Sequence, residues 1–405
     1  MSKRVSGIFI VVVGLTAGLI YLGCGGSSSG GDGDGPNVAF TTSVTGNGNL
    51  STWADAGGTT GLNAADTVCQ ARADAAALSG TFVAWMSDSS DDAYCRVLGL
   101  TGQVAANCDQ GGPPLAEAGP WIRTDGFAFA ATISQMTMGV VYAPLRYDEF
   151  GSRIPIATRT FTGTVGNGTL YTNSCSDWSS SALGTFGTNG NAEATGGWWT
   201  ASGDTDCSEN VAIMCLETGP GEALPAFAST GQLVFVSSIT GSGDLSTWPG
   251  AGVETGVGAG DAVCRDLANT AGFANTSNFK VWLSDSGNSA VSRLAGGPWV
   301  RPDGVKIAND TADLTDGELF APINVMDTLQ YDTGFGVWTG TLNTGAISAA
   351  TCSNWADTSA QGTYGSVVYA DEFWSNRSQA SCAFDFFRIY CFCLLYTSPS
   401  PRDRS

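Results

Sequence analysis

The sequence predicts a mixed α+β protein made of two consecutive copies of one disulfide-closed domain. Three features indicate this organisation: a repeat that spans most of the chain, an even number of cysteines in each copy, and an N-terminal segment typical of exported proteins. The chain has 405 residues, enough for two or three domains, and 43% of them are hydrophobic, so each copy can bury a core.

The repeat is plain when the two halves of the chain are compared. FTTSVTGNGNLSTW at 40–53 corresponds to FVSSITGSGDLSTW at 235–248. Two later pairs follow in the same order: PWIRTDG at 120–126 with PWVRPDG at 298–304, and SCSDW at 174–178 with TCSNW at 351–355. We therefore place the first domain at 38–217, the second at 234–392, and a linker rich in Pro, Gly and Ala at 218–233.

One helix near the start of each copy is predicted from its first residues. Asn63 can cap a helix over 64–78, and Gly260 and Asp261 open the equivalent helix of the second copy. Each helix carries the first cysteine of its copy among small apolar residues.

Two strands in each copy are predicted from alternating hydrophobicity. The first lies at 82–86 in copy one and at 279–283 in copy two, where apolar residues flank Lys280. The last strand covers 211–215 or 387–391. The segments between are rich in Gly, Ser and Thr, which predicts extensive ordered loops around paired tryptophans.

Residues 1–23 are predicted to be a lipoprotein signal peptide. Lys3 and Arg4 precede an apolar run at 8–22, which ends just before Cys24. The alternative is an uncleaved membrane anchor, but the run is shorter than the ~20 residues that a spanning helix needs.

Cys24 is predicted to carry a lipid that anchors the protein to the membrane. Gly25 stands where an Asp is associated with retention in the inner membrane, so we expect the protein at the outer membrane or cell surface. Residues 24–37 are typical of a flexible Gly/Ser tether. The segment 393–405 is unrelated to anything upstream and resembles a translated sequencing adapter, so we place it outside the fold.

The composition disfavours several functional classes. The net charge is −20, both copies share the acidic excess, and no segment is strongly basic. Nucleic acids are therefore not expected as partners, and other acidic polymers should be repelled. There is no histidine, which removes the commonest general base and the commonest transition-metal ligand.

Ten cysteines remain when Cys24 and Cys393 are set aside, six in copy one and four in copy two. Even numbers in an exported chain predict disulfides. Cys95 and Cys108 are the extra pair of copy one, and both lie in an insertion, so a bridge between them is the simplest pairing. The other four cysteines of each copy allow three pairings. Zinc is the alternative, disfavoured by the lack of histidine and of CxxC pairs.

Four motifs follow one another along copy one: AADTVC at 64–69, LSGTFVAWMS at 78–87, SCSDW at 174–178 and VAIMCLE at 211–217. In this order they resemble endostatin, a collagen fragment with a C-type lectin-like fold, and the bacterial domain-of-unknown-function family 1554. The resemblance implies the same fold in both copies, with the first cysteine paired to the last and the middle two to each other. The implied disulfides are Cys69–Cys215, Cys175–Cys207, Cys264–Cys391 and Cys352–Cys382.

In the wider C-type lectin-like fold, ligand sites lie in the region of the loop that the middle cysteines close. Exposed tryptophan and polar side chains there would suit stacking on a sugar ring. The candidate ligand-binding residues are Asp177, Trp178, Trp199, Asn354, Trp355 and Trp374. The alternative is core packing, which the recurrence of tryptophan at the same positions in both copies favours.

Calcium is the cofactor that lectins of this fold would imply. The acidic run DSSDD at 88–92 could ligate it, with a solvated loop as the alternative. The Glu-Pro-Asn and Trp-Asn-Asp motifs of calcium-dependent lectins are absent from the sequence, so we expect no cofactor.

No sequence motif of nucleophilic or phosphate chemistry occurs. The carboxylate pairs Asp148–Glu149 and Asp316–Glu318 remain as candidate acid/base groups. We therefore predict a surface lipoprotein, not an enzyme, whose tandem domains bind an unidentified extracellular glycan or protein. A carboxylate-dependent extracellular hydrolase and a structural envelope protein are the alternatives.

Overall fold

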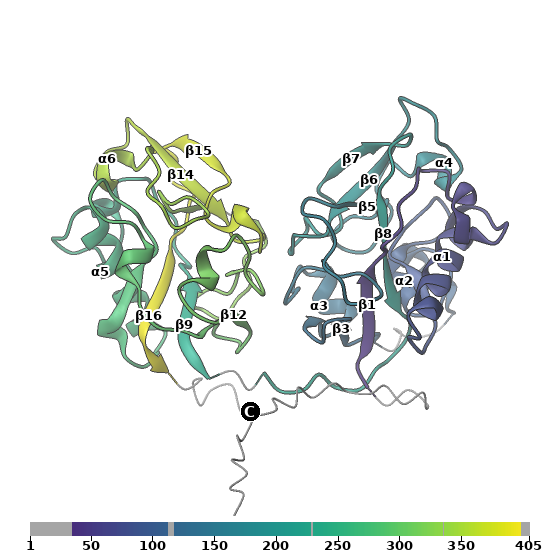
Figure 1. The fold of residues 1–405 in the computed structure, drawn as a ribbon, viewed down its shortest axis with the longest axis horizontal. Coiled ribbons are helices and arrows are strands. Elements are labelled where there is room, and N and C mark those ends of the chain that lie inside the picture. The colour runs from purple at the N-terminus through teal and green to yellow at the C-terminus, as the bar shows by residue number, and fades with distance from the viewer. Residues whose placement is uncertain (1–34, 112–116, 228–229, 335, 398–405) are drawn as a thin grey trace, which may run out of the picture. The chain divides into compact units, whose positions relative to one another are not determined.

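The computed structural model describes residues 35–111, 117–227, 230–334 and 336–397 (Figure 1). Both copies belong to one compact unit, Gly33–Ser405. The predicted signal peptide, Cys24 and most of the tether lie outside the described residues. Within these ranges, no helix combines the length and the apolar character needed to cross a membrane.

Copy one is a mixed α+β domain built around one large sheet. Its strands are β1 (Asn37–Thr41), β2 (Phe82–Ala84), β3 (Trp121–Arg123), β4 (Ala128–Ala130), β5 (Arg159–Phe161), β6 (Phe186–Asn191), β7 (Gly203–Asp206) and β8 (Ala212–Glu217). Its helices are α1 (Gly61–Ala75), α2 (Ala93–Val97), α3 (Ile133–Thr137) and α4 (Cys175–Trp178). The strand order is β4-β3-β1-β8-β5-β6-β7, and β2 also pairs with β8.

Copy two repeats this arrangement with two sheets. Its strands are β9 (Gly231–Val236), β10 (Phe279–Val281), β11 (Trp299–Val300), β12 (Lys306–Ala308), β13 (Gly336–Trp338), β14 (Gln361–Ser366), β15 (Ser378–Ser381) and β16 (Tyr390–Thr397). Its helices are α5 (Gly256–Thr270) and α6 (Cys352–Trp355). One sheet has the order β10-β16-β9-β11-β12 and the other β13-β14-β15.

The long helices begin earlier than the sequence predicted. Helix α1 starts at Gly61 with Thr60 as its N-cap, so the prediction that Asn63 caps it is wrong. The carboxylate of Asp66 is used elsewhere: it accepts a hydrogen bond from the backbone N–H of Ala84 in β2 and pairs with Arg96. The helix is thus tied to the neighbouring strand through a side chain that the sequence assigned to a helix end.

The same shift occurs in copy two, where α5 begins at Gly256, before Gly260 and Asp261. Asp261 accepts from the backbone N–H of Val281 at 3.0 Å and pairs with Arg293 at 2.6 Å. The contact between the first helix and the first predicted strand is therefore built alike in both copies.

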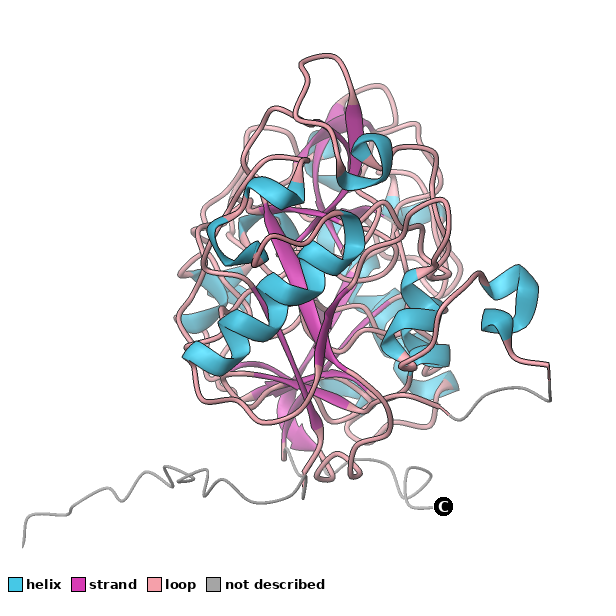
Figure 2. Cartoon of the chain, turned by 90° about the vertical axis from the view of Figure 1, so that its right-hand side faces the viewer, coloured by secondary structure: helices cyan, strands magenta, loops and turns pink. Residues whose placement is uncertain are grey.

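Strand β8 lies between two cores because its side chains alternate. Ile213 and Cys215 belong to a core that includes α1, while Met214 and Leu216 belong to the core on the opposite face. Figure 2 shows the long helix crossing the strands of copy one. Each copy is thus a layered domain whose central strands are buried on both sides.

The final strand extends past the boundary expected at Phe392. Strand β16 runs to Thr397, and Cys393 lies opposite Phe279 in the sheet. Cys393 is buried and is the one free cysteine among the described residues. The interpretation of 393–405 as wholly outside the fold is therefore wrong for Cys393–Thr397, and residues 398–405 lie outside the described ranges.

Five disulfides close the two copies, with the pairings expected from the insertion and from the resemblance. The outer bridges join the first long helix to the last strand in each copy, and their cysteines are 146 and 127 residues apart. The inner bridges span 32 and 30 residues, and the bridge of the insertion spans 13. The bridges are Cys69–Cys215, Cys95–Cys108, Cys175–Cys207, Cys264–Cys391 and Cys352–Cys382.

Candidate functional site

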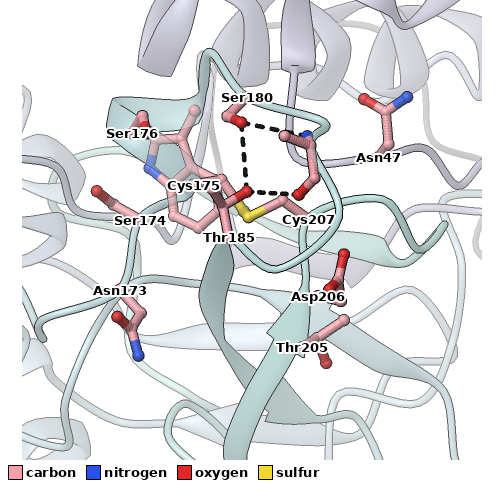
Figure 3. The surroundings of a disulfide bond; sticks show 12 residues. Asn47, Asn173, Ser174, Cys175, Ser176, Ser180, Thr185, Thr205, Asp206 and Cys207 are labelled. Atoms are coloured by element: carbon pink, nitrogen blue, oxygen red, sulfur yellow. Dashed lines mark hydrogen bonds between the residues drawn. A yellow bond between two sulfur atoms is a disulfide. The ribbon is translucent and has the colours of Figure 1, made fainter.

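The inner disulfide fixes the loop in which the sequence places the ligand site. In copy one Cys175 lies in α4 and Cys207 follows β7, with their Cα atoms 5.7 Å apart (Figure 3). Gly48 and Gly187 pack directly on Cys175, where a Cβ atom would come within 2.4 and 2.8 Å of the sulfur. Only glycine leaves room for the bridge at these two positions.

The element labelled α4 is a left-handed turn. Its four residues have φ between +49° and +60°, and the four residues of α6 have φ between +49° and +63°. Runs of non-glycine residues in this region are rare because Cβ approaches the following carbonyl oxygen, and such strain is found where surrounding structure enforces it. Here the disulfide and the hydrogen bond from the Asp177 N–H to Ser174 Oγ hold the turn.

The indoles of Trp178 and Trp355 belong to the core. Both are fully buried, and their Nε1–H groups donate to the backbone oxygens of Ser87 at 2.9 Å and Ser284 at 2.7 Å. Neither ring face is open to a ligand. The interpretation of these two residues as sugar-stacking groups is therefore wrong, because tertiary packing uses the whole side chain.

Trp199 and Trp374 are equally buried. Trp199 lies 5.0 Å from Trp85, and Trp374 lies 4.9 Å from Trp282, measured between ring centroids. These pairs fill the second core of each copy. The packing alternative is thus confirmed for all four tryptophans named as candidate ligand contacts.

Asp177 and Asn354 are exposed but serve as loop anchors. Asp177 accepts hydrogen bonds from the N–H and the hydroxyl of Ser89, which lower the pKa of its carboxyl group. Asn354 Oδ1 accepts from the Ser286 N–H at 2.7 Å. Both side chains connect the left-handed turn to the loop that follows the first strand of the copy.

The acidic run at 88–92 also holds a loop. Asp88 Oδ1 accepts from the N–H groups of Ser90 and Asp91. Asp92 is buried and accepts from the N–H groups of Val104 and Leu170. Across the described ranges, no three His, Cys, Asp or Glu side chains are grouped to hold a metal ion.

The two candidate carboxylate pairs differ in their surroundings. Glu149 is buried, accepts from Ser43 and pairs with Arg72 at 2.5 Å, so it joins loop to helix. Asp316 and Glu318 line a cleft of about 270 Å³. Burial, together with the nearby Asp313 and Glu318 carboxylates, raises the pKa of Asp316.

An exposed row of phenyl rings lies beside the inner disulfide of copy two. Phe384 and Phe386 are 45% and 47% exposed, and their centroids are 5.2 Å apart with 26° between the ring planes. Phe386 stacks on the buried Phe387 at 4.9 Å, and Phe387 lies 4.2 Å from Trp338. We call Phe384 and Phe386 the phenyl platform. It is anchored in the core at one end and open at the other.

Copy one has no such platform. Val211 takes the position of Phe387, since each bridges the corresponding glycine, Gly46 or Gly241. The segment between Cys207 and Val211 is Ser-Glu-Asn, where copy two has Ala-Phe-Asp-Phe. The sequence analysis missed this site because it looked for features shared by the copies. A local difference in an otherwise repeated pattern is the signal that could have found it.

Comparison with known proteins adds no relative: no protein-family model matches the chain, and no curated protein matches it.

Proposed function

We propose that the protein is an exported, lipid-anchored surface protein that binds an extracellular glycan through the phenyl platform. Its two copies are C-type lectin-like domains of the endostatin-like kind in this proposal, and the anchor is Cys24. The five disulfides are consistent with an exported protein. The proposal depends most on two aromatic rings held open to solvent on a covalently fixed loop.

The chemistry of the platform favours a neutral sugar. Exposed, stacked aromatic faces offer an apolar surface of defined geometry, and such patches mark interaction sites. Rings already held in place lose little conformational entropy on binding. The net charge of −20 opposes acidic polymers, so an uncharged glycan is the ligand that platform and charge both permit.

Replacing the platform with the polar residues of copy one tests this function. We expect Phe384→Ser with Phe386→Asn to lower affinity for neutral oligosaccharides at least about tenfold, because both stacking faces are lost. A glycan array followed by calorimetry measures this, and the free energy of unfolding should change little, since both rings are largely exposed.

Phe186→Ser is the matched control, because Phe186 is 48% exposed in copy one and lies outside the platform. It should bind as the unsubstituted protein does. Equal binding by the platform variant, or no binding to any neutral glycan by the unsubstituted protein, would contradict the proposal.

A hydrolase is the second candidate, because Asp316 and Glu318 line a cleft with Arg146. The raised pKa of Asp316 fits a general acid. If this candidate holds, release of reducing sugar from a polysaccharide panel should be measurable and should fall at least about 100-fold in Asp316→Asn. Absence of turnover over the whole panel excludes it.

A further inference from the structure

The two copies contact one another through equivalent positions of their chains. Ala194 of copy one and Tyr369 of copy two form an antiparallel β-bridge. They precede the corresponding Trp199 and Trp374 by the same number of residues, so the contact has the character of an isologous interface. The Thr195 N–H donates to the Val368 carbonyl at 2.8 Å. We call this contact the junction.

Four buried or half-buried charges lie beside the junction. Arg153 Nη1 is 2.5 Å from the Glu193 carboxylate, and Arg153 also contacts Glu318 of copy two at 3.2 Å. Arg146 Nη1 is 3.6 Å from both Glu193 and Glu318. Glu193 and Arg146 are almost completely shielded from solvent. Two arginines and two glutamates therefore balance one another across the two copies.

Asp371 adds a fifth charge to this cluster. It is 1% exposed, and its Oδ1 accepts from the Phe373 N–H at 3.0 Å, while its Oδ2 has no hydrogen-bond partner in the described structure. The charged groups that face it are Glu193 and Glu372, which repel a carboxylate, and Arg146, which attracts one. Burial, with the two glutamates adding to it, raises the pKa of Asp371 to about 7.

The charge state of Asp371 decides whether the cluster is neutral. When Asp371 is protonated, the two arginines cancel Glu193 and Glu318. When it is ionised, one negative charge is left buried beside Glu193 without a counter-ion, which is costly in a low-dielectric site. We propose that the junction is a proton-controlled contact: it is tight while Asp371 carries a proton and loosens when that proton is lost.

The direction of the pH effect follows from the two states of the junction. In the closed junction the pKa of Asp371 is raised, and in an open, solvated junction it returns toward the ordinary value of 3.8. The closed state is therefore favoured at low pH. Its advantage falls as the pH rises from about 4 and is lost once the pH passes about 7. Loosening would change how the two copies are held relative to a shared ligand.

Hydrogen exchange of the full chain reads the junction directly, because its backbone hydrogen bonds protect identifiable amides. Peptides covering 191–197 and 366–372 are followed at pH 5.5 and pH 8.5, with rates corrected for intrinsic exchange. We expect protection to fall at least tenfold at pH 8.5 in the unsubstituted protein and to stay constant in Asp371→Asn. Asp385→Asn, which alters an exposed carboxylate, should behave as the unsubstituted protein does.

A second variant keeps the test decisive if Asp371→Asn folds poorly. In Glu193→Gln the ionised Asp371 would itself balance the arginines, so the junction should be better protected at pH 8.5 than at pH 5.5. A general structural weakening cannot reverse the sign of the pH effect. Equal protection at both pH values in the unsubstituted protein, or the same loosening in Asp371→Asn, would overturn the proposal, and neither outcome bears on glycan binding.

Discussion

Removing the outer disulfide of copy one, by Cys69→Ala with Cys215→Ala, should lower the free energy of unfolding by about 5 kcal/mol. The bridge joins α1 to β8 across 146 residues, and a cross-link that closes a longer loop removes more entropy from the unfolded chain. Both cysteines are fully buried, so the alanine variant also leaves a small apolar void between helix and strand. Denaturant unfolding of the exported protein measures the loss.

The insertion provides the control for this effect. Cys95 and Cys108 are only 13 residues apart, and the same chain model gives about 3 kcal/mol for their bridge. The ordering therefore predicts that the outer pair is the more costly to remove. If losing Cys95–Cys108 destabilised the protein as much as losing Cys69–Cys215, the outer bridge would not be the principal closure of the domain.

Trp178→Ala should lower the free energy of unfolding by about 3–5 kcal/mol, the range found when a large buried aromatic is truncated. The indole packs 5.5 Å from Phe161 and donates to the Ser87 carbonyl, which the variant leaves without this partner. Thermal unfolding measures the change. Affinity for neutral glycans, measured below the unfolding transition, should be unaltered, because the ring is not available to a ligand.

The opposite result would restore the interpretation that the structure disfavours. If Trp178→Ala lost glycan binding while its unfolding temperature stayed the same, the indole would be a ligand contact. The parallel variant Trp355→Ala tests copy two in the same way, since Trp355 has the same burial and the same kind of backbone partner, Ser284.

The sequence predicted those parts of the fold that depend on local pattern. Alternation located the strands that begin at Phe82 and Phe279, and the structure confirms both. The helix starts were wrong because Asp66 and Asp261, which look like first-turn residues, are engaged by strand backbone far away in the chain. Such tertiary partners override local capping preference and leave no local signal.

The candidate site shows a different limit. The left-handed turns at Cys175–Trp178 and Cys352–Trp355 depend on a disulfide and on packing, so composition gave no indication of them. Residue type alone could not decide whether tryptophans in a Gly-rich loop face ligand or core. Phe384 and Phe386 were legible in the sequence as a departure from the repeat, but their exposure depends on Phe387 filling the inner position.

Mass-spectrometric mapping of disulfides in exported protein tests most directly the claim that each copy is separately closed by nested bridges. Proteolysis without reduction should give five cross-linked peptide pairs, each lying within one copy, with Cys393 recovered as a thiol. Free thiols at Cys69 or Cys391, or a bridge that joins the two copies, would contradict it.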